Sequence, residues 1–196
     1  LYTYIHDFRQ AGYLPEALVN FLALVGWSYD GQTEFLSRDQ LIGAFTLEKL
    51  NKSPAALSYD KLDHMNAAYV RSLGLNDLAG RLLWMMLQKG VETDFDTALR
   101  IAPLINERIK TLNEALSWVD FLFSDEIAYD PETLIQKKSD LAGTVAVLQA
   151  AIAAIEPLGS LEEQSLEAAL RAAAEGIGAK PGPFFGTLRV ACTGKQ

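Results

Sequence analysis

The stretch GYLPEALVNFLALVGWS, residues 12–28, gives the clearest indication of the fold. Its large apolar side chains recur at intervals of three and four residues, which is the spacing of one buried helix face: Leu14, Leu18, Phe21, Leu22 and Val25. Pro15 suits the first helical turn, where its missing N–H costs no hydrogen bond. Gly26 is expected to end the helix. The stretch therefore predicts a core helix with specific ends.

Helical spacing extends over most of the chain. We expect helices at residues 1–10, 15–25, 41–45, 58–70, 78–87, 94–103, 104–123, 139–155, 161–175 and 184–191, with another opening at 130–133 and a loop at 180–183. No run alternates apolar and polar residues as a half-buried strand would. The predicted fold class is all-α.

Several of these helices have recognisable start signals. Ser37 with Gln40, and Ser160 with Glu163, have the spacing of capping boxes, in which each residue bonds the backbone N–H of the other. Asn76 is expected to cap the helix at 78–87.

Composition limits the class of protein. The chain has 196 residues, of which 49% are hydrophobic and 21% charged, so it can build a packed core. Its single cysteine, Cys192, excludes an internal disulfide and a cysteine-based zinc site, and we expect it to fill apolar space. No apolar run approaches the roughly 18–20 residues of a membrane span, and no signal peptide is visible. The chain begins at Leu1 without Met, which favours a piece of a longer protein.

The charge is unevenly distributed. The net charge of −8 argues at first sight against a polyanionic partner. Residues 171–196, however, carry four basic residues against one acidic, and residues 49–81 carry five against three. Local charge therefore leaves nucleic-acid binding open.

The sequence contains no recognisable catalytic motif. It lacks a Walker loop, a Gly-x-Gly-x-x-Gly fingerprint, a Gly-x-Ser-x-Gly elbow and a His-Glu-x-x-His pair. The only histidines, His6 and His64, have no evident triad partners. The acidic pair Glu162 and Glu163 suits a helix start. From its residues alone, the chain is a helical binding or adaptor module, and the acidic pI of about 4.8 keeps a protein-interaction module open.

Three blocks of sequence resemble the glutamyl-tRNA synthetases of bacteria. Residues 12–28 are similar to the segment that follows the signature loop of the class I catalytic domain. EFLSRDQLIGAFTLEKLNKSPAALSYDKLDHMNAAYVRSL, residues 34–73, resembles the next block of that family, and GTLRVACTGK, residues 186–195, resembles its Leu-Arg-x-Ala-x-Thr-Gly ending. The blocks occur in the family's order, and the resemblance is weakest over residues 90–156.

The resemblance implies a stem-contact domain at residues 1–72 and a helical anticodon-binding region at 73–196, with a possible joint near 125–130. It places the catalytic domain before Leu1 and a further helix after Gln196. The intact enzyme would ligate glutamate to tRNA(Glu) with ATP and Mg²⁺ as a cytoplasmic monomer. This chain alone would hold no cofactor, bind neither DNA nor membrane, and be inactive. A related enzyme that charges both the glutamate and glutamine tRNAs is an alternative.

The resemblance also implies which residues contact the anticodon. Arg108 matches the arginine that reads the third anticodon base, where a cytosine presents its O2 and N3 acceptors. A plain helix arginine paired with Glu107 or Glu114 is the alternative. Arg189 matches the arginine at the first anticodon position and Arg171 a second arginine facing the same loop, although either can be a surface cation. Thr193 continues the same motif.

Three basic residues in the stem-contact blocks, Lys52, Lys61 and Arg71, are candidates for phosphate contacts at the inner corner of the tRNA. Ordinary solvated side chains are an equal alternative for them. Trp27, Met65 and Tyr69 lie at helical spacing among apolar residues, so we expect them to pack in the core.

Overall fold

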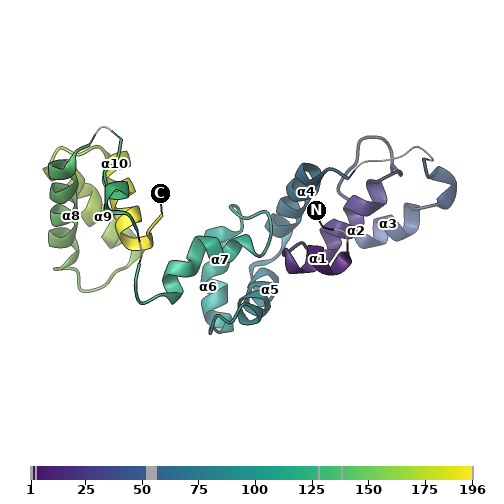
Figure 1. Ribbon diagram of the computed structural model, residues 1–196, viewed down its shortest axis with the longest axis horizontal. Helices are drawn as coiled ribbons and strands as arrows, with labels where there is room; N and C mark the ends of the chain where they lie inside the picture. The colour runs from purple at the N-terminus through teal and green to yellow at the C-terminus, as the bar shows by residue number, and fades with distance from the viewer. Residues whose placement is uncertain (1, 3, 52–56, 128, 138, 196) are drawn as a thin grey trace. The chain divides into compact units, whose positions relative to one another are not determined.

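The structure is a computed structural model that describes residues 2, 4–51, 57–127, 129–137 and 139–195 (Figure 1). Its contacts divide the chain into two compact units, residues 1–123 and residues 124–196. Throughout the described ranges the regular elements are helices, which confirms the all-α prediction.

The first unit is built on two packed groups of helices. Its described elements are α1 (Ile5–Gln10), α2 (Pro15–Leu24), α3 (Arg38–Ala44), α4 (Tyr59–Ser72), α5 (Leu75–Gln88), α6 (Phe95–Ile105) and α7 (Glu114–Val119), with the 3-10 helices η1 (Leu47–Lys49) and η2 (Asp120–Phe123). Helix α2 packs against α3 and α4, and α6 packs against α5 and α7. Leu14, Ala17 and Val70 share a core cluster with α5 to α7, so the two groups form one body.

Helix α2 follows the prediction from residues 12–28 with one exception. Leu14, Leu18 and Phe21 are buried as expected, but Leu22 is 42% exposed, so the prediction is wrong there. Leu22 comes eight residues after Leu14, which turns it about 80° around the helix. Ala17, which is fully buried, takes its place in the core.

One of the two predicted capping boxes exists. Ser37 Oγ accepts a hydrogen bond from Gln40 N at 3.2 Å, and Gln40 Oε1 accepts one from Ser37 N at 2.8 Å. The predicted box at Ser160 is wrong, because α9 begins at Glu163 with Glu162 as its N-cap and no side-chain cap. Ser160 therefore lies two residues before the N-cap of the helix that it was expected to cap.

Helix starts differ from the prediction at three further places. Helix α5 begins at Leu75, with Gly74 as its N-cap, so Asn76 lies inside the first turn and does not cap it. Asp130 opens only the short 3-10 helix η3 (Pro131–Leu134). The predicted loop at 180–183 is the first turn of α10 (Pro181–Thr193). Prolines are tolerated there, because the first-turn N–H groups have no partner within the helix.

The predicted helix at 104–123 is interrupted. Helix α6 ends at Ile105, a turn segment covers residues 106–113, and α7 and the 3-10 helix η2 follow. This turn segment carries Arg108.

The second unit is a small helical cluster. Helix α8 (Leu141–Ile155) packs against α9 (Glu163–Gly176), and α10 packs against both helices and against η3. Phe184 is fully buried among side chains that include Val147 and Leu170. Thr187 Oγ1 donates to the Leu134 carbonyl at 3.0 Å, which ties α10 to η3.

The remaining expectations for single residues have mixed outcomes. Trp27 and Met65 are buried and Tyr69 is half-buried, as predicted for core residues. Cys192 is exposed, so the prediction that it fills apolar space is wrong. None of the helices in the described ranges has the length and hydropathy that crossing a bilayer requires.

Candidate nucleic-acid interface

Arg108 lies exposed in the turn segment between α6 and α7. Its backbone N–H donates to the Ile105 carbonyl at 2.8 Å, and the next residue, Ile109, is buried. The guanidinium carbon stands 5.4 Å from the ring centre of Trp118 on α7. A guanidinium over an indole face is attracted by the ring, while its N–H groups can still donate.

The alternative interpretation of Arg108, an ion pair with Glu107 or Glu114, finds no support among the described residues. The Glu107 carboxylate lies 4.0 Å from the guanidinium of Arg71, and Glu114 accepts the Lys110 backbone N–H at 2.8 Å. Both acids are therefore close to other groups, and Trp118 is the neighbour that orients Arg108.

A hollow of about 370 Å³ joins the Arg108 turn to helix α4. Residues from both elements line it: Asp60, Asp63, His64, Ala67 and Arg71 from α4, and Glu107, Arg108, Ile109 and Lys110 from the turn. Arg71 is a candidate for contact with the tRNA stem, and Arg108 is a candidate for contact with the anticodon. Both residues thus line one hollow. Asp63, one of the acids in the hollow, already accepts a hydrogen bond from the Tyr13 hydroxyl. Burial, and then this hydrogen bond, raise the pKa of Tyr13.

The other two stem candidates are not in this hollow. Lys61 Nζ forms an ion pair with Glu34 Oε1 at 2.5 Å, with both side chains roughly half exposed. A phosphate would have to compete with Glu34 for this ammonium group. Lys52 lies outside the described residues.

In the second unit the structure brings Arg171 and Arg189 to one side of the helical cluster. The Arg171 guanidinium stands 5.7 Å from the ring centre of Phe185, and it pairs with Glu167 at 2.7 Å. Phe185 and Arg189 are four residues apart on α10, which places them on one helix face. Arg189 is exposed, and no carboxylate of the described residues lies within ion-pair distance of it.

Thr193 has a structural role at the end of α10. Its hydroxyl donates to the Arg189 carbonyl at 2.7 Å and accepts the Lys195 backbone N–H at 3.2 Å. Gly194 then ends the helix with a φ of +70°. The Thr-Gly pair of the sequence motif is thus a helix terminus one turn after Arg189.

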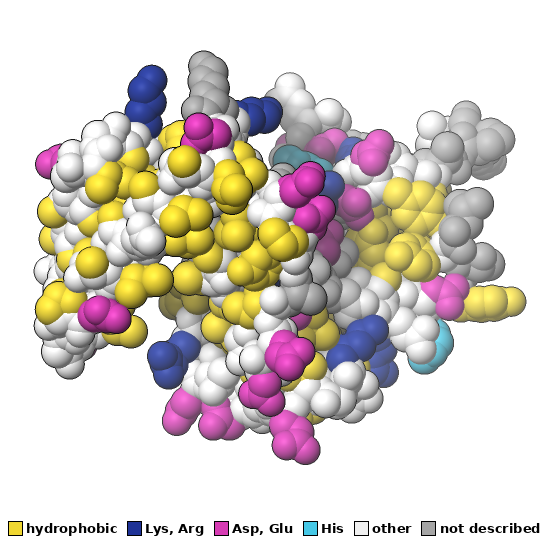
Figure 2. All heavy atoms as spheres, turned by 60° about the vertical axis from the view of Figure 1, so that its left-hand side comes forward, with side chains coloured by type: hydrophobic (Ala, Val, Ile, Leu, Met, Phe, Trp, Pro, Cys, Tyr) yellow, Lys and Arg dark blue, Asp and Glu magenta, His cyan; other side chains and the backbone are white. Residues whose placement is uncertain are grey.

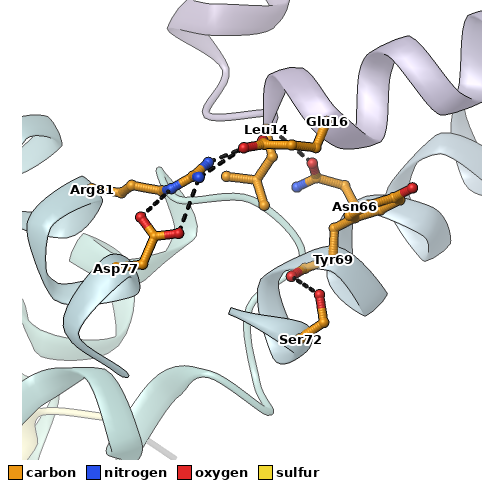
Figure 3. A network of polar contacts seen from close by, with 7 residues as sticks. All are labelled: Leu14, Glu16, Asn66, Tyr69, Ser72, Asp77 and Arg81. Atoms are coloured by element: carbon orange, nitrogen blue, oxygen red, sulfur yellow. Dashed lines mark hydrogen bonds and ion pairs between the residues drawn. The ribbon is translucent and has the colours of Figure 1, made fainter. Parts of the chain in front are cut away.

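Arg81, which contributed to the positive charge of residues 49–81, is already hydrogen-bonded to two carboxylates. Its guanidinium donates two hydrogen bonds to Glu16 at 2.8 and 3.0 Å and two to Asp77 at 2.9 and 3.2 Å (Figure 3). The bonds from Arg81 hold the pKa of Glu16 below its usual range. This cluster joins α2 to α5.

On one face of the molecule the basic side chains are dispersed. On the face that Figure 2 presents, lysine and arginine side chains occur in small groups with acidic and apolar side chains between them. Within the described residues, no group of three His, Cys, Asp or Glu side chains could hold a metal ion. Recognition at this surface would therefore depend on individual arginines.

The role of Trp118 was not predicted from the sequence. Trp118 is ten residues after Arg108, and the two residues do not lie in one helix, so helical spacing could not place them together.

This chain belongs to the anticodon-binding domain family, whose model matches residues 77–196. The model for the catalytic domain of class I tRNA synthetases (E and Q) matches residues 1–64.

The individual relatives are glutamate–tRNA ligases. That of Dehalococcoides mccartyi strain CBDB1 is 44% identical over 97% of this chain and 40% of its own length. That of Chloroflexus aurantiacus is 44% identical over 96% of this chain and 39% of its own length. A solved glutamate tRNA ligase from Elizabethkingia meningosepticum, in complex with its amino acid, matches with a TM-score of 0.80 and 27% identity, over 96% of this chain and 37% of that one. The chain thus spans about 40% of the length of these relatives.

Proposed function

We propose that this chain is the tRNA-contacting part of a glutamate–tRNA ligase, and that it binds tRNA(Glu) and recognises its anticodon. The observation that carries the proposal is the match of residues 77–196 to the anticodon-binding domain family, together with relatives at 44% identity that are glutamate–tRNA ligases. The exposed arginines Arg108 and Arg189 are groups of the kind that read unstacked RNA bases.

Arg108 is proposed to read the third anticodon base. Contact with Trp118 limits the orientations of the guanidinium, so its N–H donors can meet the O2 and N3 acceptors of a cytosine with a smaller loss of side-chain entropy. A base that presents a donor on this edge would leave the arginine without its hydrogen bonds. Selectivity at this base also separates our proposal from an enzyme that accepts both the glutamate and glutamine tRNAs.

Arg189 is proposed to contact the first anticodon position, with Arg171 beside it. Arg189 has no competing carboxylate among the described residues, whereas Arg171 must share its charge with Glu167. We therefore expect Arg189 to contribute more to binding than Arg171. The hydroxyl of Thr193 is engaged at the helix end, so we assign Thr193 the task of ending α10 close to Arg189.

The stem-contact assignments also remain proposals. Lys61 and Arg71, with Lys52 in the same blocks, would hold tRNA phosphates and add affinity with little sequence information. The proposed functional division into residues 1–72 and 73–196 falls within the first compact unit, which extends to residue 123.

The chemistry of ligation is proposed to lie in the rest of the enzyme. The sequence has no glycine-rich phosphate loop, and the described residues offer no cluster of metal-binding side chains. We therefore assign ATP and Mg²⁺ to parts of the ligase outside this chain. The intact enzyme is proposed to act as a cytoplasmic monomer with tRNA, and with neither DNA nor a membrane, as its partner.

Binding measurements test this proposal. The 196-residue chain is expected to bind a tRNA(Glu) transcript more tightly than an unrelated tRNA, and the pair of substitutions Arg108→Ala and Arg189→Ala should weaken that binding about tenfold or more. The pair Arg38→Ala and Arg100→Ala is the charge-matched control, because both arginines are exposed and neither lines the hollow. Equal affinity for both tRNAs would refute the proposed partner, and unchanged binding by the double variant would refute the site.

A further inference from the structure

The turn segment that carries Arg108 is held in part by residues that are distant in the sequence. Leu112 N donates to the Gly12 carbonyl at 2.9 Å. The side-chain amide of Asn113 donates to the carbonyl of Gln10. The segment at 110–113 is therefore attached to the connection between α1 and α2.

Asn66 on α4 forms a second attachment. Its side chain is fully buried, and its two polar atoms face different segments. The Oδ1 atom accepts the Leu14 N–H at 2.8 Å, as Figure 3 shows, and the Nδ2 atom donates to the Lys110 carbonyl. A side-chain amide can accept from one segment and donate to the other, whereas an ionised carboxylate has no donor and an alkyl group has neither.

Gly12 shows how closely the two segments approach. Its φ is +86°, and a Cβ atom at this position would lie 2.6 Å from Asn113 N and 2.9 Å from Leu112 N. The backbone of the α1–α2 connection therefore lies directly against the backbone of the turn segment. Arg108 is two residues from Lys110 and four from Leu112, so these attachments lie close to it along the chain.

We propose that Asn66 and Asn113 are positioning residues for base recognition. By fixing residues 110–113 to the α1–α2 connection, they keep the backbone of Arg108 where its guanidinium meets both Trp118 and the third anticodon base. Neither asparagine needs to touch RNA. The inference rests on the proposed role of Arg108.

The experiment measures selectivity as well as affinity. Dissociation constants of the 196-residue chain are measured for two tRNA(Glu) transcripts, one with cytosine and one with adenine at the third anticodon position. The wild-type chain is expected to prefer the cytosine transcript about tenfold or more. Asn113→Ala and Asn66→Asp should each reduce this preference at least about threefold. Asn76→Ala, at an exposed position in α5, is the matched control and should leave the preference unchanged.

A purely structural role would give a different result. Lower stability reduces the fraction of folded protein and weakens binding of both transcripts by the same factor, which leaves their ratio unchanged. Such a result for Asn113→Ala would overturn the proposal. Asn113 is only partly buried, so this variant keeps the test valid if Asn66→Asp does not fold. In the presence of Arg108→Ala, neither substitution should change the ratio further.

The outcome for Arg108→Ala separates the two proposals. If Arg108→Ala removes the preference and Asn113→Ala does not reduce it, the positioning role fails and the role of Arg108 stands. If Arg108→Ala leaves the preference intact, the proposed role of Arg108 fails, and the positioning role fails with it.

Discussion

At the scale of single residues, Gly12 lies where the neighbouring backbone leaves little room for a side chain. Its positive φ already disfavours an L-residue, and the nearby backbone of Leu112 and Asn113 occupies the space of a Cβ atom. Gly31 has nearly the same φ, +84°, but no atom within 4 Å of the corresponding Cβ position. The two glycines therefore share a positive φ, but they differ in how close other atoms lie to the Cβ position.

We predict that Gly12→Ala lowers the free energy of unfolding by about 3 kcal/mol, and that Gly31→Ala lowers it by about 1 kcal/mol. The smaller value is the cost of a positive φ, and the difference is the cost of moving the two backbones apart. Urea denaturation of both variants would measure it. Equal losses in the two variants would show that the close approach at Gly12 carries no energetic weight.

At this scale the sequence predicts local chemistry well and distant partners poorly. The cap at Ser37 is readable because its partner, Gln40, is three residues away. The buried amide of Asn66 is not readable, since its partners are 52 and 44 residues distant. Arg108 can be selected by resemblance, but its contact with Trp118 depends on how the turn segment folds.

At the scale of elements, the hydrogen-bonded cluster of Arg81, Glu16 and Asp77 joins α2 to α5. Arg81 is more buried than either acid, with 25% of its side chain exposed against 45% for Glu16. Because part of the cluster remains in water, we expect a modest contribution to stability that depends on the charge of Glu16.

We predict that Arg81→Met costs about 1 kcal/mol of unfolding free energy near pH 7. The pKa of Glu16 is lowered in the folded state, so its contribution is complete above the unfolded pKa and is lost as the pH falls through the folded value. The difference between wild type and variant should therefore shrink below about pH 4.

Denaturation at a series of pH values, with Arg100→Met as the control, would measure this change. Arg100 is exposed and has no ion pair with a described residue. If the difference between wild type and Arg81→Met stays constant down to pH 3, Glu16 is not the partner that matters.

Helix existence is largely predictable, whereas helix boundaries are less so. Apolar spacing correctly located α2, α4, α6 and α8, because each has one face in a core. The predicted starts of helices were wrong where a sequence signal is compatible with more than one structure. The prolines at 181 and 183 fit a loop as well as they fit a first helical turn, and packing of Phe184 into the core selects the helix.

At the scale of the whole molecule, each of the two compact units has its own apolar core. All three tryptophans, Trp27, Trp84 and Trp118, lie in the first unit. Tryptophan fluorescence therefore reports on the first unit, whereas far-UV circular dichroism reports on helices in both.

We predict that Phe184→Ala destabilises the second unit by about 3–5 kcal/mol, because it removes a fully buried ring. The dichroism transition should shift to a lower urea concentration, and the fluorescence transition should stay in place. Ile152→Ala on α8 is the control, since Ile152 is 57% exposed. A joint shift of both signals would mean that the two units unfold together.

The contact between Gly12 and the turn segment limits how this chain can be recombined with a relative. A chimaera that joins residues 1–72 of this chain to the remainder of a relative sets Gly12 and Asn66 against a turn segment from another protein. The two contacting surfaces would then fit only if the parent proteins have similar shapes there, even though the junction at residue 72 lies outside the contact. The segment that can be exchanged as a unit is therefore larger than the proposed stem-contact domain at residues 1–72. It is the whole of the first compact unit, residues 1–123.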